Sequence, residues 1–223
     1  MEEKQIQTRA RSPKDKEIRR VLILESSLQL FQKMELAQIS MDLIAKKSNL
    51  AKGTLYLYFK TKEEVFLALL SQKLDDWITA IKMEFGNIQH PLPAQEFAQI
   101  FSSSLSFAPE LPRLLTLPPK AHQYKLTLKS QLLEVAGAIS HKSPALTSQT
   151  TLPFLMKFYS VLIGLYSISN PNALMENVLQ NPELEIFQVS FQEQLTETLC
   201  MILVGMEEIE SKKSKSFHLF ENY

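Results

Sequence analysis

The sequence predicts an all-α protein of about nine helices. Apolar residues recur at helical spacing along most of the chain, and no useful stretch alternates apolar and polar residues as a half-buried strand does. Of the 223 residues, 45% are hydrophobic and 22% are charged, which is typical of a globular protein. Ten of the 11 prolines lie after residue 90, a distribution that favours helices over a loop-rich β fold.

The first part of the chain predicts a basic arm and one amphipathic helix. Residues 1–15 are polar and contain several Lys and Arg, and we expect them to form a mobile arm. A helix is predicted to begin near Lys16 and to fade near Glu35. Its apolar face, at helical spacing, consists of Val21, Leu24, Leu28 and Phe31.

Two short helices joined by a tight turn follow. Ser40 fits the N-cap of the first, because its hydroxyl can accept a free backbone N–H. The apolar face of that helix consists of Met41, Ile44, Ala45 and Ser48. Asn49 tolerates the left-handed conformation that ends a helix. In the second helix, over 51–58, we expect Leu55 and, just beyond it, Phe59 to face a small core.

A long helix is predicted after Thr61, which fits an N-cap with Glu64 as its capping-box partner. We expect this helix to end at Gly86. Its apolar stripe consists of Phe66, Leu70, Leu74, Trp77, Ile81 and Phe85. Further helices are predicted near 94–107, 119–140, 148–169 and 183–208. The expected domains are the arm at 1–15, a three-helix domain at 16–60, a helical bundle at 61–208 and a flexible tail at 209–223.

Charge is divided unevenly along a chain whose net charge is zero. Residues 1–62 carry 13 Lys and Arg against 7 Asp and Glu, whereas residues 63–223 carry 11 against 17. A basic N-terminal quarter on an acidic body indicates a surface built for an anion. The chain shows no secretory signal, and its longest apolar runs are far shorter than the ~20 residues that cross a bilayer. We therefore expect a cytoplasmic protein with no membrane partner.

Two short helices and a three-residue turn inside a basic segment are typical of a helix-turn-helix. The second helix of such a motif lies in the major groove of DNA, where its N-terminal side chains reach base edges. Gly53 lies near the start of that helix, where it costs about 1 kcal/mol relative to Ala. A glycine makes sense there if a partner approaches the backbone closely.

Residues from about Lys16 to Leu70 resemble the DNA-binding domain of the tetracycline-repressor-like (TetR) family of bacterial transcription regulators. The resemblance is carried by Leu28, Leu30, Phe31, Ser40, Ile44, Ala45 and Leu50, and most strongly by the run KGTLYLYFKTKEE over 52–64. It implies an all-α homodimer that binds palindromic operators. It also implies a divergent C-terminal domain that binds a small effector and releases DNA.

The chain departs from the family pattern at four positions. Glu35 and Asn49 stand where the family usually has glycine, and Ala51 replaces the usual Ser or Thr that opens the recognition helix. Asp42 lies near a position where a neutral or basic residue often faces DNA. A left-handed Glu35 would cost ~1 kcal/mol, so we expect a differently built turn there. Together these departures indicate moderate operator affinity or a shifted set of contacts.

The predicted site residues form two groups. Those expected to bind DNA are Ser40, Lys52, Gly53, Thr54, Tyr56, Leu57, Tyr58 and Lys62. Within this group we expect Lys52 and Thr54 to contact base edges, and Tyr56, Tyr58 and Lys62 to contact phosphates. An apolar effector cavity is expected in the C-terminal domain. Its predicted lining is Trp77, Phe97, Phe101, Phe107, Phe154 and Phe158, with His122 and Tyr124 as polar contacts.

Dimerisation is predicted through the last two helices. Small residues that allow close approach are Ser160, Gly164 and Ser167. The last helix presents a broad apolar stripe, which is expected to need more cover than one bundle gives. This stripe consists of Leu184, Phe187, Phe191, Leu195, Ile202 and Met206, and is widened by Leu199 and Leu203.

No catalytic, cofactor or metal site is predicted. The four histidines are scattered, Cys200 lies in an apolar helical stretch, and there is no glycine-rich phosphate loop. The preferred hypothesis is a homodimeric repressor that a small apolar or amphipathic effector releases from its operator. Two alternatives stay open, a helical interaction module and, less favoured, a helical enzyme, neither with sequence-specific DNA binding.

Overall fold

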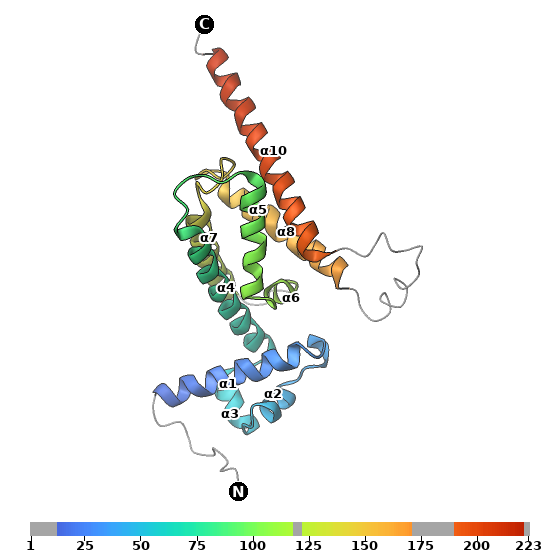
Figure 1. Ribbon diagram of the computed structural model, residues 1–223. Coiled ribbons are helices and arrows are strands. Elements are labelled where there is room, and N and C mark those ends of the chain that lie inside the picture. The colour runs from blue at the N-terminus through green and yellow to red at the C-terminus, as the bar shows by residue number, and fades with distance from the viewer. Residues whose placement is uncertain (1–12, 118–121, 171–189, 221–223) are drawn as a thin grey trace, which may run out of the picture. The chain divides into compact units, whose positions relative to one another are not determined.

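A computed structural model describes residues 13–117, 122–170 and 190–220, with side chains for 13–117, 128–170 and 190–212. Within these ranges the secondary structure consists of nine α-helices and two 3₁₀ turns, and no strand is present (Figure 1). The all-α prediction is therefore confirmed. The chain divides into two compact units, Met1–Gln72 and Lys73–Tyr223.

The first unit contains three complete helices, one 3₁₀ turn and the start of a fourth, longer helix. These are α1 (Pro13–Phe31), the 3₁₀ turn η1 (Leu36–Gln38), α2 (Met41–Lys47), α3 (Lys52–Tyr58) and the beginning of α4 (Lys62–Gly86). Helix α1 packs on α2, and α2 packs on α3 (Figure 1). The rings of Phe31 and Phe66 lie 5.2 Å apart and join α1 to α4.

The buried face of α1 differs from the predicted stripe. It consists of Ile23, Leu24, Ser26, Ser27, Leu30 and Phe31, whereas Val21 is 37% exposed. The predicted stripe omitted Ile23 and Leu30 as well as the two serines, and it included Val21, which lies at the surface. The Ser27 hydroxyl donates to the Ile23 carbonyl at 2.7 Å, which satisfies it locally and allows it to be buried.

The predicted helix-turn-helix boundaries are confirmed by their caps. Ser40 is the N-cap of α2, and its hydroxyl accepts a hydrogen bond from the Leu43 amide at 3.2 Å. Asn49, in the turn between α2 and α3, has a left-handed φ of 53°. Ala51 precedes α3 without a side-chain cap, as its methyl group requires.

The turn before α2 is built without left-handed backbone at Glu35, whose φ is −70°. Glu35 instead forms a capping box with Gln38, which accepts from the Glu35 amide at 3.1 Å. The capping box predicted at the start of α4 is only half formed. The Thr61 hydroxyl accepts from the Glu64 amide at 3.2 Å, but the Glu64 carboxylate accepts from the Lys60 amide at 2.6 Å.

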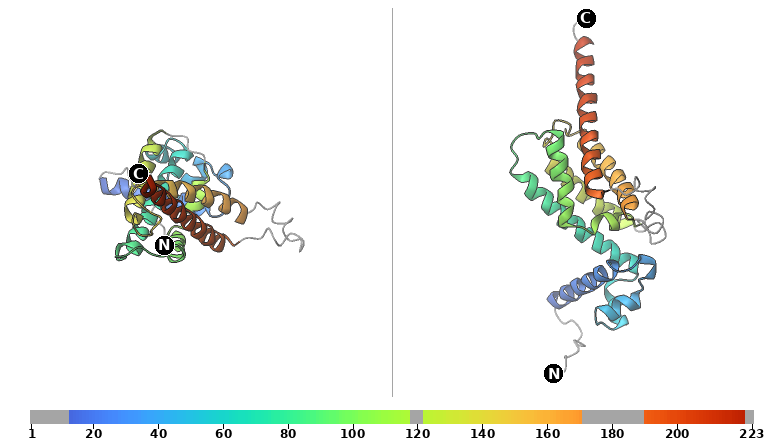
Figure 2. Two further views of the ribbon diagram at one scale, coloured as in Figure 1. Left: turned by 90° about the horizontal axis from the view of Figure 1, so that it is seen from above. Right: turned by 45° about the vertical axis from the view of Figure 1, so that its right-hand side comes forward.

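Within the described residues, the second unit is a bundle of five α-helices, one 3₁₀ turn and the rest of α4. Its further elements are α5 (Ala94–Ser103), η2 (Ser104–Phe107), α6 (Leu111–Leu115), α7 (His122–Ile139), α8 (Thr151–Ser169) and α10 (Phe191–Phe220). Helix α10 packs on α5 and α8, while α6 and α7 pack on α8 (Figure 1 and Figure 2). The predicted stripe of α4 is buried along its whole length.

Two elements of the second unit differ from their predictions. Helix α6 lies between the helices predicted near 94–107 and 119–140, where no helix was predicted, and Pro112 lies in its first turn, where proline loses no helical hydrogen bond. Helix α10 continues to Phe220 through the predicted tail. Lys212 and Glu208, four residues apart, form an ion pair at 2.8 Å that favours this extension.

The last two helices have separate buried and exposed faces. In α10, Leu195, Leu199 and Leu203 are buried within the unit, so these three members of the predicted dimer stripe belong to the internal core. Leu184 and Phe187 lie outside the described residues. Among the described helices, α8 has the length and apolar content of a membrane span. Its Phe154, Leu155, Phe158 and Leu162 are nevertheless buried in the bundle.

Candidate nucleic-acid interface and effector core

Helix α3 separates an inward face from an outward face as the sequence predicts. Leu55 is fully buried and Phe59 is 6% exposed, and the Arg20 guanidinium carbon lies 5.8 Å from the centre of the Phe59 ring. Lys52 and Gly53 are exposed, and Leu57 is 78% exposed. An exposed leucine on a short basic helix has no role in the core of this unit and is available to a partner.

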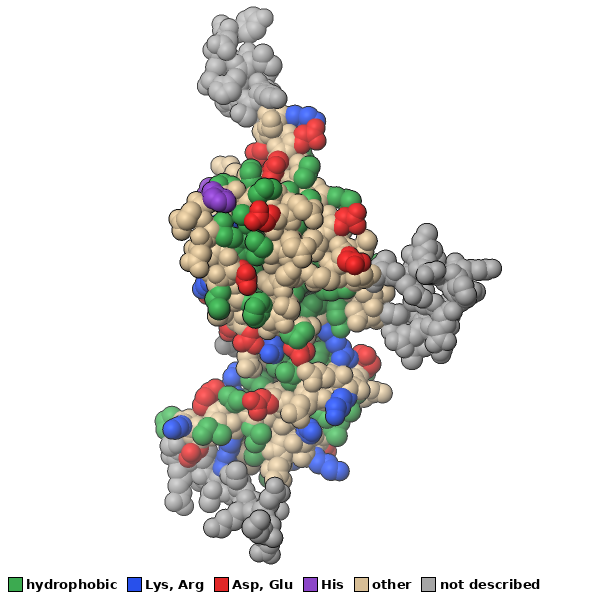
Figure 3. Space-filling model, in the orientation of Figure 1, with side chains coloured by type: hydrophobic (Ala, Val, Ile, Leu, Met, Phe, Trp, Pro, Cys, Tyr) green, Lys and Arg blue, Asp and Glu red, His purple; other side chains and the backbone are tan. Residues whose placement is uncertain are grey.

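The predicted tyrosines and Thr54 have intermediate exposure. Thr54, Tyr56 and Tyr58 are each partly covered by the first unit. Their outer atoms remain accessible, as a contact with DNA requires. On the face of the first unit that Figure 3 shows, Lys and Arg side chains are spread over the surface, among them those around α2.

Gly53 meets no neighbour within the protein. A Cβ atom built at this position would lie in open space, with no atom within 4 Å apart from its chain neighbours and the backbone of its own helix. The packing of the first unit therefore does not require glycine here. A requirement for a bare backbone at Gly53 would therefore come from a binding partner.

Lys52, the first residue of α3, forms an ion pair with Asp42 in the first turn of α2. Its Nζ lies 2.6 Å from the Asp42 Oδ1, and both side chains are more than half exposed. The hydrogen bond and the charge of Asp42 raise the pKa of Lys52 above its ordinary value. The sequence pattern marked Asp42 as a departure from its family but did not indicate this pairing.

The two lysines at the start of α4 bind backbone carbonyls of the first unit. The Lys60 Nζ donates to the Tyr56 carbonyl at 2.8 Å. The Lys62 Nζ donates to the carbonyls of Leu36 at 2.8 Å and Ile39 at 2.9 Å. Sequence spacing predicted a phosphate contact for Lys62, whereas the structure gives its ammonium group two partners within the protein.

The predicted effector-lining aromatic residues form one cluster, except Phe107. Trp77 lies 5.6 Å from both Phe101 and Phe158, measured between ring centres, and Phe101 lies 5.6 Å from Phe154. Phe97 stacks on Phe101 at 5.5 Å. These residues come from α4, α5 and α8 and are almost completely buried. In this structure their rings pack directly against one another.

Two polar contacts border this cluster. The Trp77 Nε1 donates to the Ser104 hydroxyl at 2.8 Å, and both groups are buried. The hydroxyl groups of Ser102 and Thr196 lie 2.7 Å apart and join α5 to α10. Neither serine was predicted as a site residue, because an isolated serine carries no signal in a helical pattern.

Three predicted effector contacts fall outside the cluster. Phe107 ends η2 with 56% of its surface exposed, so the structure contradicts its assignment to an enclosed lining. Phe107 lies in a 3₁₀ turn, whereas the sequence predicted a continuous helix over 94–107. The side chains of His122 and Tyr124 lie outside the described residues.

Comparisons with protein families account for both units. A family described as "Bacterial regulatory proteins, tetR family" matches residues 23–69. A second, described as "Tetracyclin repressor-like, C-terminal domain", matches residues 71–210. Together the matches include most of the chain.

Individual relatives agree with the family matches. The chain is 27% identical over 184 residues to the uncharacterized HTH-type transcriptional regulator YhgD of Bacillus subtilis, covering 75% of this chain and 94% of that protein. It is also 27% identical over 93 residues to the fatty acid metabolism regulator protein of the same organism. That match covers 42% of this chain and 47% of the relative.

Solved structures share the fold at low sequence identity. A TetR-family transcriptional regulator from Streptomyces coelicolor superposes with a TM-score of 0.59 at 15% identity, covering 91% of this chain and 86% of that one. The fatty acid degradation regulator FadR from Bacillus halodurans has a TM-score of 0.54 at 17% identity, covering 88% and 97%. With both units matched by family models, the chain belongs to the TetR family and is a ligand-responsive, DNA-binding transcription regulator.

Proposed function

We propose that the chain acts as a homodimeric repressor whose α3 helices bind two operator half-sites and leave them when an apolar effector binds. The observation that carries this proposal is the outward face of α3. It presents a lysine, a glycine and an exposed leucine while its inward side chains are buried. That division suits a helix whose N-terminal residues enter the major groove.

The outward residues differ in the DNA groups that they suit. Lys52 has donors for guanine O6 and N7, and Thr54 offers both a hydroxyl for a base and a methyl for thymine. Leu57 is apolar and suits a thymine methyl group. The phenol groups of Tyr56 and Tyr58 suit phosphates, and the Ser40 hydroxyl at the start of α2 suits the DNA backbone.

Selection of bound duplexes from a random pool, followed by binding to single-base variants, tests this proposal. Lys52→Ala and Thr54→Ala are expected to relax preference at particular operator positions by about 1–3 kcal/mol each. Tyr58→Phe is expected to weaken binding to all DNA sequences equally, because it removes only one hydrogen bond to the DNA backbone. If the selection returns no preferred sequence, or if Tyr58→Phe changes base preference, this docking of α3 is wrong.

A surface on α8 and α10 supports the homodimer. Its exposed apolar side chains are Leu152, Met156, Tyr159 and Ile168 on α8, and Met201, Val204 and Ile209 on α10. A groove of about 510 Å³ runs between these helices, lined by Pro153, Met156, Lys157, Ser160, Val161 and Ile202. Ser160, in the lining, and the small residues Gly164 and Ser167 of the same helix are all exposed. We propose that a second copy of the chain covers this α8–α10 surface.

The effector proposed here is an apolar or amphipathic molecule that enters the aromatic cluster around Trp77. The cluster is apolar, and the Trp77–Ser104 hydrogen bond places a polar group at its border. Two relatives are named as regulators of fatty acid metabolism or degradation, which supports a fatty acyl compound as the first to try. To release DNA, the effector must favour a conformation whose two α3 helices no longer match the half-site spacing.

Titration with fatty acids, acyl thioesters and short polar acids tests the effector class. Trp77 is the single tryptophan, so its fluorescence reports on the cluster alone. Long acyl compounds are expected to shift that fluorescence, raise the melting temperature and lower operator affinity, whereas short acids are expected to do none of these. A thermal shift without any change at Trp77 would place the site elsewhere. We propose in addition that the protein is cytoplasmic and acts without catalysis.

A further inference from the structure

Lys62 is a predicted DNA contact whose ammonium group binds two backbone carbonyls in another segment of the first unit. It is the first residue of α4, and its side chain is partly buried. Its ammonium group donates to the Leu36 and Ile39 carbonyls, which lie 26 and 23 residues earlier in the chain. Charge-assisted hydrogen bonds of this kind are stronger than neutral ones.

The two carbonyls belong to the turn that leads into α2. Leu36 begins η1, and its carbonyl also accepts from the Ile39 amide at 3.2 Å. Because a carbonyl has two lone pairs, both donors are accommodated. Ile39 is buried, and the capping box between Glu35 and Gln38 closes the other side of the turn. The turn is therefore closed by its own hydrogen bonds and joined to α4 by Lys62.

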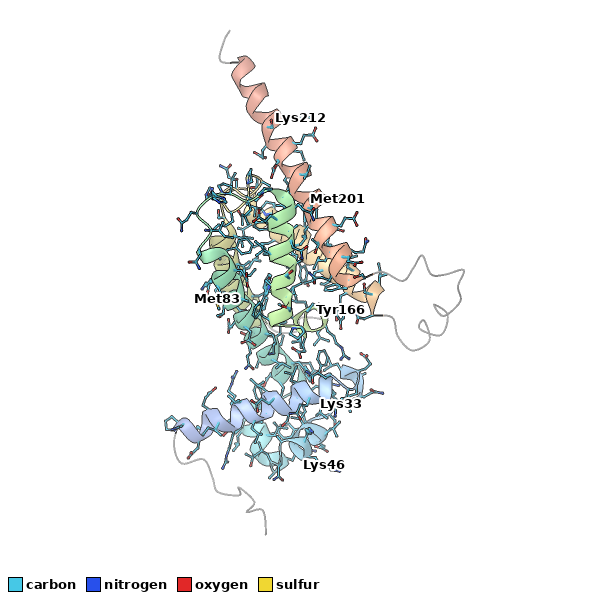
Figure 4. All side chains as sticks on the ribbon, viewed as in Figure 1. Lys33, Lys46, Met83, Tyr166, Met201 and Lys212 are labelled. Atoms are coloured by element: carbon cyan, nitrogen blue, oxygen red, sulfur yellow. The ribbon has the colours of Figure 1, made fainter. Side chains whose placement is uncertain are left out.

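This arrangement differs from that of an exposed lysine whose ammonium group is available to a DNA phosphate. Lys33 and Lys46, labelled in Figure 4, are exposed on the surface of the first unit. The Lys60 ammonium also has a carbonyl partner, but that carbonyl is only four residues away, at the end of α3. An ammonium group has three donors, and Lys62 directs two of them at one turn of another element.

We propose that Lys62 is a positioning residue, whose ammonium group fixes the η1 turn, and with it α2, to the first turn of α4. This inference rests on the proposed function, because the position of α2 and α3 matters for docking on DNA. Since α4 continues into the second unit, a movement of its first turn is passed to α2 through this side chain as well as through the α3–α4 connection.

Two substitutions separate positioning from phosphate contact. Lys62→Met keeps a similar apolar stem and removes every donor. Lys62→Gln removes the charge but keeps an amide group with two N–H donors, as many as there are carbonyls to satisfy. Lys33→Met is the matched control, because it removes the same charge from an exposed position of the same unit.

The first measurement is hydrogen exchange of the full-length protein without DNA. Lys62→Met is expected to accelerate exchange of the Ile39, Leu43 and Ile44 amides about tenfold, because the turn and the start of α2 lose their tie to α4. Lys62→Gln is expected to have a smaller effect, and Lys33→Met none. Unchanged exchange in Lys62→Met would overturn the proposal. If that variant does not fold, the comparison of Lys62→Gln with Lys33→Met decides.

The second measurement is the salt dependence of binding to a random-sequence duplex. A phosphate contact by Lys62 requires that both Lys62 variants lose about 0.9 from the slope of log K against log salt. Positioning requires that Lys62→Gln keep the wild-type slope, and a loss of about 0.9 in that variant would overturn it. If the wild-type protein binds no DNA, the proposed function fails, while the exchange measurement still decides the role of Lys62.

Discussion

At the scale of single residues, Asp42 places a negative charge beside the first residue of the recognition helix. Its carboxylate lies 2.6 Å from the Lys52 ammonium, so the DNA contact proposed for Lys52 would require this lysine to leave or share its partner. Both side chains are mostly exposed, and such a pair adds little to stability. Its main effect is therefore expected on DNA binding, where the carboxylate has the same sign of charge as the phosphates.

Asp42→Asn is expected to tighten DNA binding. It leaves Lys52 charged, because loss of Asp42 only lowers a raised lysine pKa toward its ordinary value, far above neutral pH. The slope of log K against log salt should steepen by about 0.9 on a random-sequence duplex, since one more cation becomes free to displace a counterion. Binding at several salt concentrations measures this. Weaker binding to the selected operator would show instead that Asp42 orients Lys52 toward a base.

Gly53→Ala is expected to change stability and DNA binding in opposite directions. The added methyl group meets open space in the protein, and alanine favours helix, so unfolding should cost about 0.5–1 kcal/mol more. Operator affinity should fall if the DNA backbone approaches this position closely. Chemical denaturation and operator titration of the same preparation test both effects. Undiminished affinity would remove the argument that DNA selects the glycine.

At the scale of secondary-structure elements, Phe101 and Phe107 lie in different surroundings, although the sequence predicted that both line the effector cavity. Phe101 is fully buried and contacts Trp77, Phe97, Phe154 and Phe158, whereas Phe107 is 56% exposed on η2. Removal of a large buried ring leaves a cavity, and removal of an exposed ring does not. The two positions therefore form a matched pair.

Phe101→Ala is expected to lower the free energy of unfolding by about 3–5 kcal/mol, and Phe107→Ala to change it by less than about 0.5 kcal/mol. Urea denaturation followed by circular dichroism compares them. If Phe101→Ala does not fold, Phe101→Leu provides a milder test with the same sign. Equal costs at the two positions would contradict the buried cluster described above.

At the scale of the whole molecule, the α8–α10 surface is the feature that one copy of the chain leaves uncovered. Met201 and Val204 are 63% and 52% exposed, although both are apolar and neighbouring turns of α10 are buried. Figure 4 marks Met201 on α10 and Met83 on α4, a second exposed methionine outside this surface. The same substitution can therefore be made at an exposed methionine inside the proposed dimer surface and at one outside it.

Met201→Lys and Val204→Lys are expected to weaken the dimer by at least about 100-fold, because an unpaired charge would be buried between the subunits. The Met83 side chain is 69% exposed, and Met83→Lys is expected to leave the affinity of the dimer unchanged. Sedimentation equilibrium over a range of concentrations measures the three. A wild-type monomer at micromolar concentration, or an equal effect of Met83→Lys, would contradict the proposed surface.

The helical class, the helix-turn-helix and the family follow from the amino-acid sequence alone. These depend on local signals: the Ser40 cap, the left-handed Asn49, the spacing of Leu55 and Phe59, and the stripe of α4. Each is set by a few neighbouring residues, so periodicity and capping chemistry were sufficient to predict it. The same signals placed Lys52, Gly53 and Leu57 on one outward face.

The contacts between side chains of different elements, in contrast, follow from the folded structure. Lys62 reaches a turn 26 residues away, and Asp42 pairs with Lys52 across the helix-turn-helix, and no pattern of spacing encodes either contact. The difference between Phe101 and Phe107 likewise depends on where α5 gives way to η2. Hydrogen bonds and packing between distant segments depend on backbone geometry in three dimensions, which a one-dimensional periodicity does not contain.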